Sequence, residues 1–235
     1  MHSALGGWFP ERKLLPYLIM GLVQSYGKWG WGNLEMWGLL WYNSQNIVSF
    51  QENAMNTLLH ICCAPCANRC IDVLRGDKFE VTGFWYNPNI HPFTEYRARR
   101  NCLRDYAPTI DLPLIEKNDY ALRPFVREVA GDIANRCEKC YEMRLFETAR
   151  QAAEGGFDSF TSSLFISPYQ NHELMRQTAE RAAAQFGVTF LYRDFRPYFK
   201  EGQEKARELG FYMQKYCGCV FSEEERYLKR SKIIP

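Results

Sequence analysis

The sequence predicts an α/β fold, with a mostly parallel sheet of about five strands and a helical C-terminal segment. From residue 56 onward, short apolar runs alternate with longer segments of helical periodicity. The first apolar run, 58–61, ends abruptly at Cys62 and Cys63, with Cys66 three residues further on. Ligands of parallel α/β folds gather outside the carboxyl ends of the strands. A site is therefore expected where the first strand ends.

Each element follows from a local pattern. Strands are expected over 57–62, 79–86, 110–116, 157–164 and 189–192. The first helix is expected to begin near Pro65, which suits a first helical turn, and to end at Gly76. Further helices are expected over 93–106, 119–129 and 137–153, in a segment that ends at 186–187, and over 202–209. Asp119 is the expected N-cap of the helix that ends at residue 129.

The composition is that of a globular chain. It has 235 residues, of which 46% are hydrophobic and 24% charged, and a net charge of +2. So small a net charge neither favours nor excludes a nucleic-acid partner. The unusual feature is nine cysteines, all between Cys62 and Cys219, because an odd number cannot pair completely. In an intracellular α/β protein this pattern indicates metal or redox chemistry.

Residues 1–55 differ from residues 56–235, and we expect two parts. The first part holds five of the six tryptophans, no cysteine and no clear period. One hypothesis is that Met55 is the biological start; the alternative is an aromatic appendage that docks on the core or on a partner. The apolar run 14–23 has no small-residue cleavage site, and it is shorter than the roughly 20 apolar residues that span a bilayer. A cytoplasmic protein without a membrane segment is therefore expected.

Seven of the nine cysteines form three groups. They are Cys62, Cys63 and Cys66; Cys137 and Cys140; and Cys217 and Cys219. Thiols without a clear histidine partner favour an iron–sulfur cluster or zinc over calcium or magnesium. One such metal site uses three or four ligands, so about three thiols remain for a second metal or a redox-active pair. Cys70 and Cys102 are expected to be small buried hydrophobic residues.

Other residue types point to RNA binding and to proton transfer. Four arginines of the helix expected over 93–106 suit the phosphates of an RNA with unstacked bases, and the alternative is an ordinary solvated face. These arginines are Arg97, Arg99, Arg100 and Arg104. His91 and His172 follow strand–loop junctions and are candidate proton donors. His60 lies within the first strand and is expected to be a hydrogen-bonded core residue.

Six motifs, in order along residues 56–231, resemble the QueH family of epoxyqueuosine reductases. They are LLHICCAPC (58–66), YNPNIH (86–91), EYR (95–97), RCEKCYEMRL (136–145), SPYQNH (167–172) and YCGCVFS (216–222). The three cysteine groups together with YNPNIH are a highly specific combination. Residues 1–55 have no counterpart in this pattern, which supports Met55 as the start.

The resemblance implies a Rossmann-like domain akin to the HUP and nucleotide α-hydrolase folds. It implies the reduction of epoxyqueuosine to queuosine at the wobble position of tRNA, the last step of queuosine biosynthesis, by an iron–sulfur enzyme that needs no cobalamin. It also implies that a 4Fe-4S cluster is bound by Cys62, Cys63, Cys137 and Cys140. By the same resemblance, Cys217 and Cys219 are a redox-active pair or bind a second iron or other metal, and Cys66 is a further metal ligand.

The implied reaction also requires partners. Two electrons and two protons must be supplied, so an electron donor is expected besides tRNA. We therefore expect the catalytic residues to be Cys217, Cys219, His91 and His172. Two other functions stay open, namely a zinc-stabilised RNA-binding module without catalysis and a thiol–disulfide oxidoreductase without metal.

Overall fold

The structure is a computed structural model that describes residues 54–228. Its sheet has five parallel strands in the order β3-β2-β1-β4-β5, which confirms the predicted fold class. The strands are β1 (Asn56–His60), β2 (Glu80–Trp85), β3 (Leu114–Glu116), β4 (Ser159–Ser162) and β5 (Thr189–Phe190). The predicted extension lies almost wholly outside the described residues, so its division from the catalytic part stays a prediction.

Helices connect the strands. They are α3 (Ala64–Gly76), α4 (Phe93–Tyr106), α5 (Leu122–Val129), α6 (Arg136–Glu154), α7 (His172–Phe186), α8 (Phe199–Glu208) and α9 (Val220–Leu228). Short 3-10 turns are η1 (Ala107–Ile110), η2 (Ile133–Asn135), η3 (Ser163–Ile166) and η4 (Arg196–Tyr198). Within residues 54–228, no helix is both long and apolar enough to cross a membrane.

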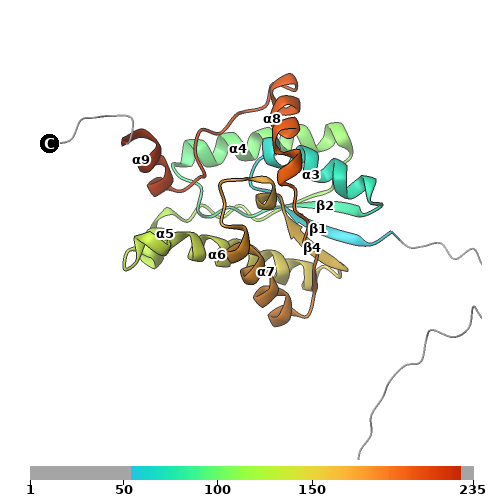
Figure 1. Ribbon diagram of the computed structural model, residues 1–235, viewed down its shortest axis with the longest axis horizontal. Helices are drawn as coiled ribbons and strands as arrows, with labels where there is room; N and C mark the ends of the chain where they lie inside the picture. The colour runs from blue at the N-terminus through green and yellow to red at the C-terminus, as the bar shows by residue number, and fades with distance from the viewer. Residues whose placement is uncertain (1–53, 229–235) are drawn as a thin grey trace, which may run out of the picture. The chain divides into compact units, whose positions relative to one another are not determined.

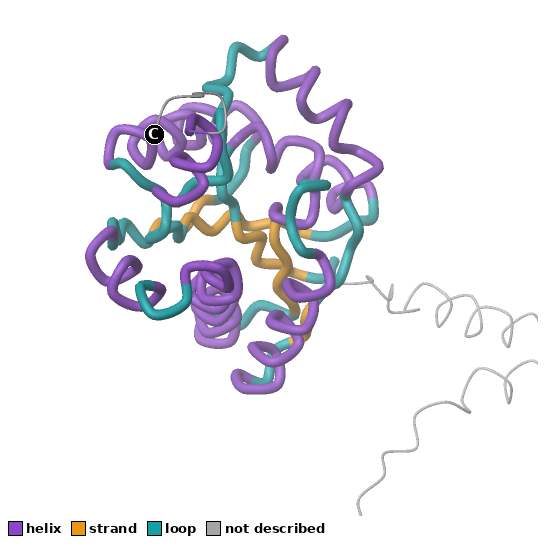
Figure 2. Tube along the Cα trace, turned by 60° about the vertical axis from the view of Figure 1, so that its left-hand side comes forward, coloured by secondary structure: helices purple, strands orange, loops and turns teal. Residues whose placement is uncertain are grey.

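The helices cover both faces of the sheet (Figure 1). Helices α3, α4 and α8 lie on one face, where α3 contacts both of the others. Helices α6 and α7 pack against each other on the opposite face, with α5 beside α6. Figure 2 shows the strands enclosed between these two helical layers. Parallel strands buried on both faces read as near-continuous apolar runs, which is why the apolar run 58–61 predicted a strand over 57–62, close to the observed β1.

The core is built from the central strands and from the inner faces of the helices. Leu58, Leu59, Phe84 and Phe160 are completely buried in it. Neighbouring strands are paired in parallel register, so that Leu59 lies opposite Gly83 on one side. A Cβ on Gly83 would lie 2.9 Å from the Cδ1 of Ile61, so a larger residue there would force neighbouring side chains to shift.

Two local predictions were wrong. The third strand is Leu114–Glu116 and not 110–116, because Ala107–Ile110 form a 3-10 turn and Asp111 has a left-handed backbone with φ 49°. Asp119 does not cap the following helix, whose N-cap residue is Ala121. The Ala121 N–H instead donates to a backbone carbonyl of the loop after β2, and this contact decides where the helix begins.

Candidate functional site

The strand order reverses between β1 and β4, and such a reversal is where parallel α/β sheets bind ligands. His60, the last residue of β1, lies 2.9 Å through Nδ1 from Ser162 Oγ and 3.1 Å through Nε2 from the Tyr86 carbonyl. It is completely buried, so the prediction of a satisfied core histidine is confirmed. Burial and then the charge of Arg144 lower the pKa of His60 to about 4, which keeps the imidazole neutral at neutral pH.

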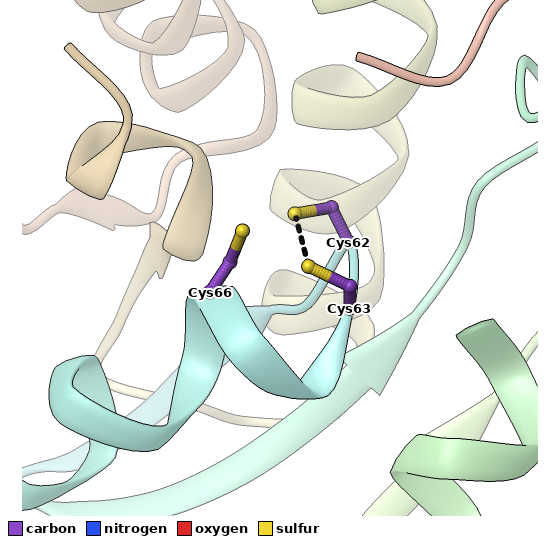
Figure 3. Close-up of side chains that lie close together, drawn as sticks. All are labelled: Cys62, Cys63 and Cys66. Atoms are coloured by element: carbon purple, nitrogen blue, oxygen red, sulfur yellow. Dashed lines mark hydrogen bonds between the residues drawn. The ribbon is translucent and has the colours of Figure 1, made fainter. Parts of the chain in front are cut away.

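Three thiols meet directly after β1 (Figure 3). The Sγ atoms of Cys62, Cys63 and Cys66 all lie within 4.8 Å of one another, and those of Cys62 and Cys63 are 3.7 Å apart. Cys63 has an extended backbone and precedes α3, whose first turn contains Pro65 and carries Cys66. The Oγ of Ser163, which follows β4, accepts from the Cys62 N–H at 3.2 Å. The turn is thus fixed to the segment that follows the neighbouring strand β4, and it brings the three sulfurs together.

Hydrogen bonds among these thiols move their pKa values apart. Contacts from Cys63 and Cys66 lower the pKa of Cys62 well below its usual value, against the opposing effect of burial. Burial and then the Cys62 contact raise the pKa of Cys63, and the Cys62 contact raises that of Cys66. Of the three thiols, Cys62 is therefore the one that ionises most readily. Because soft metal ions bind thiolates, this group of three can hold a metal ion.

The other four clustered cysteines come from the start of α6 and from the loop before α9. Cys140 and Cys219 pack together in a small apolar cluster with Phe125. Burial and then the neighbouring Cys217 thiol raise the pKa of Cys137. The start of α6 and the loop before α9 are therefore close enough for their thiols to interact electrostatically. All nine cysteines are free thiols, and within residues 54–228 only the group after β1 has three sulfurs within 4.8 Å of one another.

A cavity of ≈ 710 Å³ opens at this edge of the sheet. Cys62 and Cys66 line it from the group after β1, and Cys217 lines it from the loop before α9. Two glutamines on its wall touch these sulfurs. Gln214 donates through Nε2 to Cys66 Sγ at 3.2 Å, and Gln170 donates through Nε2 to Cys217 Sγ at 3.1 Å. The cavity therefore joins thiols that are far apart in the sequence.

The loop that carries Cys217 is held in place by hydrogen bonds to its backbone carbonyls. The His91 N–H donates to the Gly218 carbonyl at 2.8 Å, and Arg99 donates to the carbonyls of Tyr216 and Cys217, each at 3.0 Å. Gly218 has φ +148°, and a Cβ there would lie 3.2 Å from a neighbouring side chain. Only glycine adopts this conformation readily. The short Cys-Gly-Cys segment thus has a defined position next to the YNPNIH motif.

The two histidines predicted to be catalytic are not among the residues that line the cavity. His91 is buried, its Nε2 lies 3.2 Å from the Pro88 carbonyl, and burial lowers its pKa to about 4. His172 begins α7, and its Nε2 lies 3.0 Å from the Ser167 carbonyl. The Nδ1 atoms of both are buried without a hydrogen-bond partner among the described residues. Their catalytic roles stay predictions.

The four arginines predicted to contact tRNA lie in different environments on α4. Arg99 is 1% exposed and pairs with Glu95 at 2.7 Å, so its guanidinium is engaged inside the protein. Arg97 is exposed, and Arg100 lies 3.4 Å from an asparagine amide oxygen. Arg104 pairs with a glutamate of β3 at 2.8 Å while remaining 42% exposed. Contacts from all four to RNA stay predictions, but Arg99 has an internal role as well.

Three residues of the site were missed by sequence reasoning. Gln170 lies within the motif SPYQNH, and Gln214 precedes the motif YCGCVFS. The sequence alone does not distinguish a glutamine that hydrogen-bonds to a thiol from a glutamine on the protein surface. Arg144 is different, because it follows Cys140 by four residues on α6 and donates to the Cys140 sulfur at 2.8 Å. Residues four apart share a helix face, and this spacing was the available signal.

The fold and the site together define a thiol-rich α/β protein that can bind a metal ion where the strand order of its parallel sheet reverses. The family model for "Epoxyqueuosine reductase QueH" matches residues 57–225. A protein of that name from Dehalococcoides mccartyi is 39% identical over 176 residues, which cover 75% of this chain and 97% of the relative. One from Thermotoga maritima is 34% identical over 186 residues, which cover 75% of this chain and 94% of the relative. The chain belongs to the QueH family of epoxyqueuosine reductases, as its motifs predicted.

Proposed function

We propose that this chain reduces epoxyqueuosine to queuosine at the wobble position of tRNA, in the cytoplasm and with an iron–sulfur cluster. The observation that carries the proposal is the convergence of Cys62, Cys66 and Cys217 on one cavity at the carboxyl ends of the strands. Membership of the family supports the reaction, because the relatives bear the name of this reductase.

The donor set fits an iron–sulfur group. The proposed ligands of a 4Fe-4S cluster are Cys62, Cys63, Cys137 and Cys140. When bound, such a cluster would supply electrons one at a time. The Asn89 side chain supports a bound group beside the 217–219 loop, because it is completely buried and both of its polar atoms lack a partner among the described residues. The Nδ2 atom of Asn89 lies 3.9 Å from the position that a Cβ on Gly218 would occupy, which places it beside this loop. Buried side-chain amides normally have hydrogen-bond partners, so a bound group would supply the partner that Asn89 lacks.

The proposed reaction removes the epoxide oxygen as water and leaves a carbon–carbon double bond. It consumes two electrons, which come from an external donor, and two protons. Cys217 is the predicted catalytic residue that lines the cavity, whereas Cys219 is buried in the apolar cluster. We assign one of the protons to the Cys217 thiol, because Cys217 lines the cavity and its sulfur lies 3.1 Å from the Gln170 side-chain nitrogen. Cys66, Cys217 and Cys219 remain the candidates for a second metal or a redox-active pair.

The test is an anaerobic assay. The protein is purified without oxygen, its iron and acid-labile sulfide are measured, and it is mixed with dithionite and tRNA that carries epoxyqueuosine. Queuosine should appear in the nucleosides released by digestion of the tRNA, and visible absorbance should fall on reduction. A colourless protein that contains only zinc and binds tRNA without changing it would instead identify an RNA-binding module.

Two cations that line the cavity are proposed to contact the tRNA backbone. Lys215 and Arg226 line the cavity and also an adjoining hollow of ≈ 430 Å³. Replacing both by glutamine should weaken tRNA binding, and it should lower the slope of log affinity against log salt by about one per lost phosphate contact. Lys78→Gln is the control, because this exposed lysine lies just before the start of β2, at the amino ends of the strands and so away from the cavity. Equal slopes for the wild type and the double variant would exclude this contact.

A further inference from the structure

A buried arginine, Arg144, contacts the sulfur of Cys140 near the start of α6. Arg144 is 1% exposed and donates through its guanidinium to Cys140 Sγ at 2.8 Å and to the Cys140 carbonyl at 3.2 Å. Burial lowers its pKa, but the thiols of Cys140, Cys217 and Cys62, in that order, raise it. These cysteines follow β1, begin α6 and precede α9, so one cation acts on thiols from three separate segments.

Among residues 54–228, the charge of Arg144 has no carboxylate partner. No salt bridge joins Arg144 to an acidic side chain in the part of the chain that the structure describes. Removing a guanidinium from water costs several kcal/mol unless an anion compensates it. Ligation of metal by thiolates would supply the missing negative charge.

We propose that Arg144 is a positioning residue that compensates the negative charge of the bound iron–sulfur group and so favours both its binding and its reduction. The inference rests on the proposed function. Ligation converts thiols to thiolates, and each added electron brings one further negative charge to the site. A fixed cation at 2.8 Å from one ligand sulfur stabilises both changes.

Two variants separate the charge of Arg144 from its shape. Arg144→Lys keeps the charge, whereas Arg144→Gln keeps an N–H donor for the Cys140 sulfur and loses the charge. Arg150→Gln is the control on the same helix, because Arg150 is partly exposed and pairs with Glu147 and Glu154. Each protein is purified anaerobically, checked for folding by circular dichroism, and titrated electrochemically with detection by electron paramagnetic resonance.

For Arg144→Gln we expect the equilibrium constant for one-electron reduction to fall at least about tenfold, equivalent to 59 mV. Arg144→Lys and Arg150→Gln should keep the wild-type potential. Equal potentials in all four proteins would overturn the proposal, and so would equal shifts in the two Arg144 variants. Should Arg144→Gln not fold, Arg144→Lys decides alone: a wild-type potential supports the proposal, and a tenfold fall overturns it.

A second measurement needs no iron–sulfur group. The metal-free proteins are titrated with Co²⁺, whose bonds to thiolates give an intense absorbance. Arg144→Gln should bind Co²⁺ at least about tenfold more weakly than wild type, the scale of losses caused by residues that support metal ligands. Unchanged affinity would overturn the role in binding. A wild-type protein that lacks iron and is inert toward tRNA would defeat the proposed function, yet the Co²⁺ comparison would still test Arg144.

Discussion

Cys63→Ser is expected to remove most of the bound iron and to lower reductase activity by more than about a hundredfold, the upper range for residues that only support a metal ligand. Cys63 is 1% exposed, and its sulfur lies 3.7 Å from that of Cys62. A serine hydroxyl is a harder donor than a thiolate and does not ionise near neutral pH, so it cannot replace this ligand. Iron content and single-turnover reduction of tRNA measure the two effects.

Cys70→Ser is the matched control for this prediction. Cys70 is also completely buried and lies on α3, but its sulfur donates to the Cys66 carbonyl at 3.2 Å, outside the group of three thiols. A serine can make the same hydrogen bond, so iron content and activity should stay near those of the wild type. Similar losses in the two variants would mean that the serine disturbs the fold and not the metal site.

Arg99→Met is expected to lower the free energy of unfolding by about 3–5 kcal/mol, the usual effect of removing one partner of a buried ion pair. The Glu95 carboxylate, 7% exposed, would lose its cation, although the Tyr212 hydroxyl would still donate to it. The carbonyls of Tyr216 and Cys217 would also lose their donors. The loop before α9 would then be less ordered, so activity should fall together with stability. Denaturant unfolding and the tRNA assay provide the measurements.

Two comparisons make this result specific. Arg97→Met makes the same chemical change at an exposed position of α4 and should alter stability by no more than about 0.5 kcal/mol. Arg99→Lys keeps a cation for Glu95 but cannot bridge two carbonyls as well, so its stability should be intermediate. If Arg99→Met instead kept full stability and only flattened the salt dependence of tRNA binding, Arg99 would be an RNA contact and not an internal clamp.

The α4 helix shows how far sequence reasoning reached. Its bounds, Phe93–Tyr106, match the predicted range, because the segment lies between a turn and a proline. Its arginines all looked alike in the sequence. Glu95 and Arg99 nevertheless stand four residues apart on the same face as Leu103, and that face is buried. Helical spacing from the apolar residues could have separated Arg99 from the exposed Arg97.

The sequence by itself determined the order of strands and helices, the place of the first thiols after a strand, and the family, because each depends on residues that are close together in the chain. Only the tertiary structure decided that Cys217 reaches the cavity that Cys62 and Cys66 line, and that Gln170 and Gln214 contact these sulfurs there. Such contacts depend on how the crossover helices pack and where the last loop returns. The spacing of residues along the chain does not determine the distances between residues of separate segments.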